Sequence, residues 1–435
     1  MRLLLVSPRF PPSSAADSQR LRMLLPHFSP QGVEAEVLAV DPGAVAAPLD
    51  PWQAEHLPAE TAIHRVPALP LAWARLPGLG SIEARSLRFL AAAGDRLLAK
   101  HHFDLVYFST TAFGSFVLGP RWQERFGVPF VLDYQDPWVN DHYREHPELR
   151  PPGGRFKHAI ADRLSRHREP RVLRHAAGIT AVSAAYPAQL EARYPFAAAI
   201  PSLVLPFPGS ATDFQNLDSI PTSVLPFDPS DGLIHWVSVG RGGADLEQAL
   251  AGLFQALADH APAELRSRLR LHFLGTSYAP DGQGIASIQP LAERFGLGAL
   301  VQEVTDRLPL SRALACLKAA SALLVIGSND PSYTASKLYP YLLARRPLLA
   351  IMHRNSSVVD VVQRCGGGRV VTFESTTPPE RISQAIAEQW LLHGQHLKPV
   401  PLNASAFARH TAAAQAEQLV AFFRDCLSSR EINPR

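Results

Sequence analysis

Cysteine is scarce in this sequence, and long apolar runs are absent. The three cysteines among 435 residues are far apart and form no CxxC pair, so neither a disulfide framework nor a structural zinc site is expected: Cys316, Cys365 and Cys426. No apolar run approaches the roughly 18 residues that cross a membrane. The apolar stretch after Met1 is shorter than the apolar part of a signal peptide, about 7–15 residues. We therefore expect a cytoplasmic protein.

A strong charge imbalance and the familiar catalytic motifs are also missing. The formal net charge is only +3, so the composition does not indicate a nucleic-acid-binding protein. No GxGxxG follows a predicted strand, and no Walker A loop, GxSxG or HExxH occurs. These absences argue against dehydrogenases, P-loop NTPases, serine hydrolases and metalloproteases. Asp-x-Asp is absent too, so we expect no metal and no cofactor, and a diphosphate held by backbone amides, helix ends and basic side chains.

The sequence does contain an alternation of short apolar runs and segments with helical periodicity. In the first half, apolar runs predict buried parallel strands at 3–7, 36–40, 105–108, 130–132 and 179–182. The alternation restarts in the second half, with strands predicted at 234–239, 271–274, 322–326, 348–351 and 369–373. The pattern predicts an α/β fold of two doubly wound, Rossmann-like domains that face a cleft.

The composition also suggests the domain boundaries. Residues 1–205 are predicted to form the first domain, the proline-rich stretch 206–231 a linker, and residues 232–400 the second domain. The tail 401–435 contains one long predicted helix at 404–429, which is longer than the second domain needs. We therefore expect this helix to cross back and brace the first domain.

Polar residues directly after the predicted strands are the candidate site residues of the first domain, because doubly wound sheets bind ligands at the carboxyl ends of their strands. Pro137 fixes the backbone after Asp136, which we interpret as an acid or base in the cleft. Asp133 is instead interpreted as a helix cap or an arginine partner. Thr110, after the strand at 105–108, either caps a helix or contacts a ligand.

In the second domain the same strand-end loops predict a phosphate site. The strand at 234–239 leads into Gly240 and Arg241, whose planar guanidinium suits a phosphate. Lys337 lies in the first turn of a helix predicted at 336–344, where its charge opposes the helix dipole, so an anion is expected there. Further residues of these loops complete the candidate site: Gly275, Thr276, Thr334 and Ser336.

The stretch 155–175 is basic, with seven lysine and arginine residues. A basic, partly amphipathic helix can lie on anionic lipid. The alternative is a solvated face with local ion pairs. The localisation that we expect is therefore cytoplasmic, or peripheral at the inner face of the membrane.

Several segments in fixed order resemble GT-B glycosyltransferases, specifically the family 4 retaining enzymes. In the first half they are LLLVSPRFPP, DLVYFS, FGVPFVLDYQDPW and AAGITAVS. In the second half they are VSVGR, LHFLG, VTDRLPLSRALACLKAASALLVI and SKLYPYLLARRPLLAI. The resemblance implies sugar transfer from a nucleotide diphosphosugar, with the donor in the second domain and a glycan, lipid-linked or small-molecule acceptor in the first.

Carried over by position, Arg241 resembles the arginine that grips the donor diphosphate, and Ser336 and Lys337 match the helix start at the phosphates. Other positions depart from the family. Ser332 and Pro340 replace a pair of glutamates, of which the second usually holds the ribose, and Leu246 and Glu247 occupy the place of a lysine. Ala15 and Ala16 replace a glycine pair, and Gln135 replaces a histidine. The resemblance implies acceptor-side roles for four residues: Ser13, Ser14, Thr110 and Trp138.

The sequence is therefore interpreted as that of a metal-independent glycosyltransferase. Two alternatives stay open: a GT-B nucleotide-sugar epimerase, and a non-catalytic nucleotide-sugar-binding protein, which the missing glutamate pair favours. The sequence leaves the nucleotide base, the sugar and the acceptor undetermined.

Overall fold

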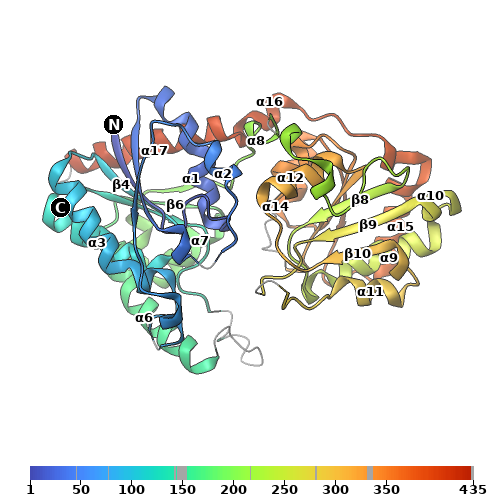
Figure 1. Cartoon of the computed structure of the whole chain (residues 1–435), viewed down its shortest axis with the longest axis horizontal. Coiled ribbons are helices and arrows are strands. Elements are labelled where there is room, and N and C mark those ends of the chain that lie inside the picture. Colours follow the sequence, from blue (N-terminus) through green and yellow to red (C-terminus); the bar gives the residue numbers. More distant parts are fainter. Residues whose placement is uncertain are drawn as a thin grey trace. The chain divides into compact units, whose positions relative to one another are not determined.

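The chain folds into two compact units (Figure 1). The computed structural model describes residues 1–45, 47–76, 78–141, 144, 154–215, 217–279, 282–330 and 337–432. Unit 1 comprises Met1–Pro208 and Ala412–Arg435, and unit 2 comprises Gly209–Thr411. Each unit is built around its own parallel sheet.

The sheet of unit 1 has seven strands in the order β3-β2-β1-β4-β5-β6-β7, and every pair is parallel. Its strands are β1 (Arg2–Val6), β2 (Glu34–Val40), β3 (Ala62–Val66), β4 (Leu105–Ser109), β5 (Phe130–Tyr134), β6 (Gly178–Ala181) and β7 (Ser202–Val204). Central strands such as β4 are buried on both faces, which is why they read as continuous apolar runs.

Helices cover both faces of this sheet. They are α1 (Gln19–Leu24), α2 (Trp52–Glu55), α3 (Ile82–Lys100), α4 (Leu118–Phe126), α6 (Arg155–Leu173), α7 (Ala185–Arg193) and α17 (Ala412–Ile432). Alternate residues of β1 enter opposite cores: Leu4 packs in the core that includes α3 and α4, and Leu5 in the core that includes α1 and α17. In Figure 1 the red helix α17 lies among the blue elements of unit 1.

The sheet of unit 2 has six parallel strands in the order β10-β9-β8-β11-β12-β13. They are β8 (Ile234–Val239), β9 (Leu269–Leu274), β10 (Val301–Val304), β11 (Ala322–Ile326), β12 (Leu348–His353) and β13 (Arg369–Phe373). The helices are α8 (Thr212–Gln215), α9 (Glu247–His260), α10 (Ala263–Arg268), α11 (Ile288–Arg294), α12 (Leu310–Ala319), α13 (Leu338–Leu343), α14 (Ser357–Cys365), α15 (Pro379–Ile386) and α16 (Ala404–Phe407).

The two parallel sheets confirm the predicted doubly wound α/β fold. Three of the observed strands were not predicted from the sequence. β3 and β7 are the edge strands of unit 1, and β10 is an edge strand of unit 2. All three carry partly or fully exposed side chains. An edge strand whose side chains are partly exposed to solvent does not need a continuous apolar run. Its sequence therefore lacks the pattern by which the central strands were predicted.

The segments between the predicted domains differ from their prediction. Residues 209–231, assigned to the linker 206–231, belong to unit 2, where Phe227 stacks on His235 with ring centroids 4.7 Å apart. The predicted helix 404–429 is also interrupted, because α16 and α17 are separate helices and residues up to Thr411 belong to unit 2. Helix α17 packs on unit 1, where the ring centroids of Phe423 and Tyr107 lie 4.9 Å apart.

Both strand orders reverse direction at one position, between β1 and β4 in unit 1 and between β8 and β11 in unit 2. The loops at the carboxyl ends of such neighbouring strands diverge to opposite faces of the sheet and leave room for a ligand. The topology therefore directs attention to the loops after β1 and β4, and to those after β8 and β11.

Candidate functional site

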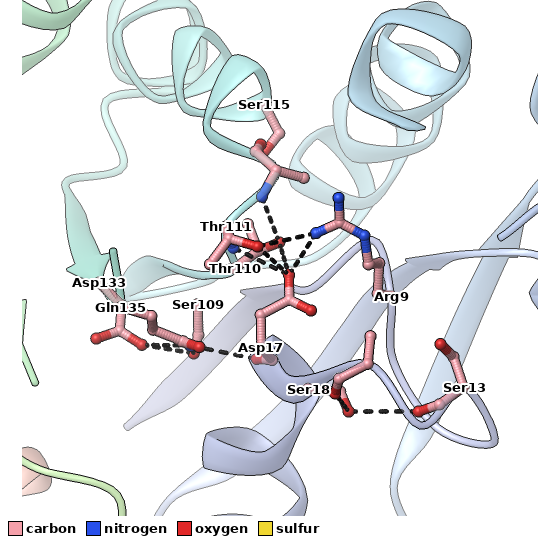
Figure 2. A network of polar contacts seen from close by, with 12 residues as sticks. Arg9, Ser13, Asp17, Ser18, Ser109, Thr110, Thr111, Ser115, Asp133 and Gln135 are labelled. Atoms are coloured by element: carbon pink, nitrogen blue, oxygen red, sulfur yellow. Dashed lines mark hydrogen bonds and ion pairs between the residues drawn. The ribbon is translucent and has the colours of Figure 1, made fainter. Parts of the chain in front are cut away.

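The loops after β1 and β4 meet at a buried carboxylate, Asp17 (Figure 2). Its Oδ2 atom accepts hydrogen bonds from Thr110 Oγ1 at 2.8 Å, and from the amide and hydroxyl of Thr111 at 2.9 and 3.1 Å. Arg9 Nη1 lies 2.8 Å from the same oxygen, and the Arg9 side chain is 26% exposed against 3% for that of Asp17. Asp17 is thus satisfied inside the protein, while Arg9 presents part of its guanidinium at the surface.

A second carboxylate, Asp133 at the end of β5, is fully buried beside Arg20 of α1. Arg20 Nε lies 2.7 Å from Asp133 Oδ2, and both side chains are 0% exposed. Ser109 Oγ and Gln135 Nε2 each donate to Oδ2 at 2.8 Å, and Thr180 Oγ1 donates to Oδ1 at 2.9 Å. Asp133 is therefore the arginine partner that the sequence analysis offered as one structural role.

Gln135, in the place of the family's histidine, connects the two carboxylates. Its Nε2 atom donates to Asp133 and also, at 3.2 Å, to the backbone carbonyl of Asp17. With both acidic residues held by neighbouring groups, Gln135 serves as a positioning residue of this edge of the sheet.

Asp136, the predicted acid or base, keeps an exposed side chain, and no described residue donates a hydrogen bond to its carboxylate. Partial burial raises the pKa of Asp136 above the ordinary value for aspartate, and the negative charge of Asp17 adds to this effect. Burial and the charge of Asp136 raise the pKa of Tyr186 in α7 to about 12. Asp136 is thus the carboxylate of this edge that remains open to a ligand.

The other predicted residues of unit 1 have different surroundings. Thr110 contacts Asp17 and does not cap a helix. Ser13 is fully buried, and its hydroxyl has no hydrogen-bond partner among the described residues. Ser14 donates to a backbone carbonyl at 2.9 Å, and the ring of Trp138 packs edge-on against that of Phe116 at 5.6 Å. The structure therefore brings Thr110 into the network and gives Ser14 and Trp138 local packing partners.

In unit 2 the loop after β8 places Arg241 beside Asp245. The loop needs glycine, because Gly240 and Gly243 have φ angles of 133° and 140°. Arg241 Nη1 and Nη2 donate to the two carboxylate oxygens of Asp245 at 2.8 and 2.6 Å. Although burial acts in the opposite direction, hydrogen bonds from Arg241 and Ser328 lower the pKa of Asp245. The guanidinium that was predicted to grip a diphosphate therefore contacts a carboxylate of its own loop.

Lys337 is the residue immediately before α13, and its side chain approaches the same loop. A Cβ atom at Gly240 would lie 3.2 Å from Lys337 Nζ, so glycine provides the space for the ammonium group. Burial and the charges of Arg241 and Arg307 lower the pKa of Lys337 to about 8. No carboxylate in the described part of the chain forms an ion pair with Lys337. Three cationic groups thus lie near one another with Asp245 as a partial counter-charge.

The loops after β9 and β10 border this cationic group. Gly275 donates its amide proton to a carbonyl of β10 at 2.8 Å, and Thr276 Oγ1 donates to Glu303 at 2.7 Å. Arg307 follows β10, and its guanidinium lies 4.7 Å from the ring centroid of Tyr278. Two further predicted residues lie outside the described residues: Thr334 and Ser336.

Sequence reasoning missed three residues that the structure places in these networks: Asp17, Arg20 and Arg307. Asp17 looks like an ordinary acid at a helix start, a common position for such residues. Arg20 carried no signal, because its partner lies more than a hundred positions away in the chain. Arg307 follows β10, and since the sequence did not predict that strand, nothing pointed to the loop at its end.

The two networks differ in the chemistry they offer. In unit 2, Arg241, Lys337 and Arg307 suit a polyanion such as a diphosphate. In unit 1, Asp136 can accept a proton or a hydrogen bond from a hydroxyl group. No group of three or more histidine, cysteine, aspartate or glutamate side chains is arranged to hold a metal ion among the residues that the structure describes.

Comparison with known proteins identifies a family that matches part of the chain and solved structures with a similar fold. Residues 18–206, most of unit 1, match the family described as "Glycosyl transferase 4-like domain". No curated protein is significantly similar to the chain in sequence. The chain is similar in structure to HepE of Anabaena in complex with UDP-glucose, with 15% identity, a TM-score of 0.58, and coverage of 99% of this chain and 100% of that chain.

Two other solved structures share this architecture. Trehalose 6-phosphate synthase from Burkholderia multivorans has 13% identity and a TM-score of 0.59, over 98% of this chain and 99% of that chain. WaaG, a glycosyltransferase involved in lipopolysaccharide biosynthesis, has 13% identity and a TM-score of 0.53, over 98% of both chains. The family match over residues 18–206 supports the predicted glycosyltransferase class, and the structural likeness confirms the predicted GT-B fold.

The charge state of Lys337 predicts how anion binding in unit 2 depends on pH. Because its pKa in the free protein is about 8, Lys337 is mostly charged at pH 7 and mostly neutral at pH 9. Binding of inorganic pyrophosphate should therefore weaken by up to about tenfold over this range. In the Lys337→Arg variant the side chain stays charged from pH 7 to pH 9. This variant is therefore the matched control, because any change in its affinity over this range comes from the titration of pyrophosphate itself. Isothermal titration calorimetry that finds the same pH dependence in both proteins would exclude Lys337 from the anion site.

Proposed function

We propose that this chain transfers a sugar from a nucleotide diphosphosugar to an acceptor hydroxyl, with retention of anomeric configuration and without a metal ion. The observation that carries the proposal is the cluster of three cationic side chains at the carboxyl edge of the sheet of unit 2. Arg241, Lys337 and Arg307 lie near one another at the carboxyl edge of the sheet, where doubly wound folds bind ligands. UDP-glucose in the complex of HepE supports a donor of this class.

The donor diphosphate would replace Asp245 as the partner of Arg241. The guanidinium makes two parallel hydrogen bonds to Asp245, and a phosphate accepts the same fork geometry. Lys337 would add a compact positive charge without a competing carboxylate in the described part of the chain. These cations would stabilise the negative charge that develops on the leaving diphosphate, which is the task a metal ion performs in other enzymes.

The acceptor would bind to unit 1, with Asp136 acting on its hydroxyl group. Asp136 is exposed at the carboxyl end of β5 and lacks a hydrogen-bond donor among the described residues. Its raised pKa brings it closer to the range in which a carboxylate is an effective base. The family resemblance supports retention, with Asp136 orienting the acceptor hydroxyl or contacting the donor sugar.

The exposed face of α6 supports peripheral contact with an anionic membrane. Phe156, Ile160 and Leu164 recur every fourth residue and are 76%, 45% and 42% exposed. Glu169 comes nine residues after Ile160, about 180° around the helix, and is fully buried. Helix α6 lies at the margin of unit 1 (Figure 1). Exposed cations accompany its apolar stripe: Arg155, Lys157, Arg163 and Arg171.

Ion pairs hold the opposite face of α6 to unit 1. Glu169 accepts a hydrogen bond from the Tyr194 hydroxyl at 3.0 Å, and Arg193 bridges Glu169 and Asp141 at 3.4 and 3.0 Å. Arg166 also pairs with Asp141. The stripe is thus presented outward on an anchored helix. No described helix is both long and apolar enough to span a bilayer.

A second candidate function is binding of a nucleotide sugar without transfer. The bidentate Arg241–Asp245 pair favours it, because a phosphate must compete with a carboxylate that is already well placed. Pro340, in the first turn of α13, also lacks the carboxylate that usually holds a ribose. Thermal stabilisation by nucleoside diphosphates without turnover of any nucleotide sugar would favour this candidate.

Asp136→Asn should lower transfer turnover by about 10²–10⁴-fold, the usual contribution of a positioned acid or base. The change is nearly isosteric at an exposed position, so the melting temperature and the affinity for free nucleoside diphosphate should be unchanged. Asp133→Asn is the matched control, because it removes the charge that pairs with buried Arg20 and should lower the melting temperature. Turnover near the wild-type level in Asp136→Asn would remove Asp136 from catalysis.

Transfer should continue in the presence of a chelator, because the proposed diphosphate partners are side-chain cations. We expect the same initial rate before and after treatment with EDTA, and no increase on addition of Mg²⁺ or Mn²⁺. A rate that falls with EDTA and recovers with either metal would contradict the metal-independent mechanism.

The α6 surface should bind vesicles that contain phosphatidylglycerol and not vesicles of phosphatidylcholine alone. Replacing Phe156, Ile160 and Leu164 together by serine should weaken binding by roughly tenfold or more, because their apolar area no longer leaves water. Ile285→Ser, at an 87% exposed apolar residue of unit 2, is the matched control. Co-sedimentation with these vesicles should show weaker binding as the salt concentration increases. Equal binding of the triple variant and the wild type would exclude the α6 surface as the membrane-binding site.

A further inference from the structure

A groove lies at the carboxyl ends of β2 and β3, apart from the Asp17 and Asp133 networks of unit 1. Its volume is about 410 Å³, which lies in the lower part of the range for small-molecule sites. One wall follows β2 and includes Asp41, Gly43 and Ala44, and the other is the segment 65–71 at the end of β3. It therefore opens at the same edge of the sheet as the proposed acceptor site.

A buried arginine fixes the width of this groove. Arg85 of α3 is 2% exposed, and its guanidinium donates to the carbonyl of Leu69 at 2.8 Å and to that of Ala44 at 3.0 Å. The amide of Leu69 donates back to the carbonyl of Arg85 at 3.0 Å. One side chain thus ties both walls together, so the groove exists before any ligand binds.

The lining combines two charged residues, Asp41 and Arg65, with an apolar segment that favours an apolar guest. The segment 66–71 consists of valine, alanine, leucine and proline residues, and the prolines have no amide proton to donate. The amides of Gly43 and Leu69 already bind Asp41 Oδ1 and the Arg85 carbonyl. Along this segment a sugar ring, which needs several polar partners, would find few of them, whereas an alkyl chain needs none.

The apolar surface continues beyond the groove. Leu71, which lines the groove, is 55% exposed, and Trp73 and Leu76 in the same segment are 48% and 51% exposed. Clustered exposure of large apolar side chains marks an interaction site more often than isolated exposure does. The groove and this rim together offer a continuous surface to a chain longer than the groove alone could hold.

A direct contact joins the groove to the loop after β1. Arg65, which lines the groove, donates from Nη2 to the carbonyl of Pro11 at 2.5 Å. Pro11 lies in the loop after β1, between Arg9 and the buried Asp17. A molecule seated in the groove would therefore lie next to the loop after β1, which also leads to Asp17.

We propose that the groove binds the apolar chain of an amphipathic acceptor, such as a single-chain alkyl or isoprenoid glycoside, whose sugar receives the transferred residue. This inference rests on the proposed transferase function, which it extends by naming the acceptor class. Shape and lining select for the chain, and the loop after β1 selects for the sugar.

Binding of alkyl β-D-glucosides tests this inference directly. Methyl, hexyl and octyl glucoside, each below its micelle concentration, should bind with affinity that rises by roughly fourfold for every methylene buried. Octyl glucoside should therefore bind about tenfold or more tightly than hexyl glucoside in isothermal titration calorimetry. Affinity that is independent of chain length would overturn the proposal.

Three variants assign the binding to the groove. Ala68→Trp should fill the groove and abolish the dependence on chain length, and Leu71→Ser, at an exposed rim position, should weaken octyl glucoside binding severalfold. Leu397→Ser, at a 62% exposed leucine of unit 2, should have no effect. Unchanged nucleoside diphosphate affinity and melting temperature verify that each variant is folded. Octyl glucoside affinity equal to wild type in both groove variants would show that the chain binds elsewhere.

The same experiments separate this inference from the proposed function. If the chain binds alkyl glucosides through the groove but transfers no sugar, the transferase proposal fails and the groove assignment stands. If it transfers sugar equally well to methyl and octyl glucoside with equal affinity, the transferase proposal stands and the groove assignment fails.

Discussion

The buried ion pair between Asp133 and Arg20 is the constraint on which the rest of unit 1 depends. Asp133 accepts hydrogen bonds from α1, from the ends of β4 and β6, and from Gln135. Removing one partner of such a pair costs about 3–5 kcal/mol, because an uncompensated charge is left in the interior. Arg20 also donates to the Leu205 carbonyl beyond β7 at 2.6 Å. The pair thus fixes the carboxyl edge of the sheet and the loops that carry Asp17 and Asp136.

The two units use the same topology with opposite charge. At the strand-order reversal of unit 1 lie carboxylates, held by hydroxyls, an amide and arginines, with Asp136 left open to solvent. At the carboxyl edge of the sheet of unit 2 lie Arg241, Lys337 and Arg307, and burial together with the charges of the two arginines lowers the pKa of Lys337. The proposed sugar transfer from a nucleotide diphosphosugar would require a base for a hydroxyl on one unit and a binding site for a polyanion on the other.

Apolar surface outside the cores supports an amphipathic acceptor. The stripe on α6 and the groove beside β2 and β3 belong to different elements of unit 1, and each is held in place by buried charged groups: Glu169 beneath α6, and Arg85 beneath the groove. Holding exposed apolar residues on a rigid support keeps them from collapsing onto the protein. A lipid surface for the one and an alkyl chain for the other are consistent occupants.

The sequence by itself determined the doubly wound architecture, because central parallel strands are buried on both faces and must read as apolar runs between helices. It also singled out Asp136, Arg241 and Lys337 as candidate site residues, since strand-end loops follow directly from those runs. Edge strands such as β3 and β10 lack a continuous apolar run, so neither Arg307 nor the groove beyond β3 could be predicted from the sequence. Only the tertiary structure paired Arg20 with Asp133, set Asp245 against Arg241 and joined α17 to unit 1, because these contacts depend on residues that packing, and not sequence spacing, brings together.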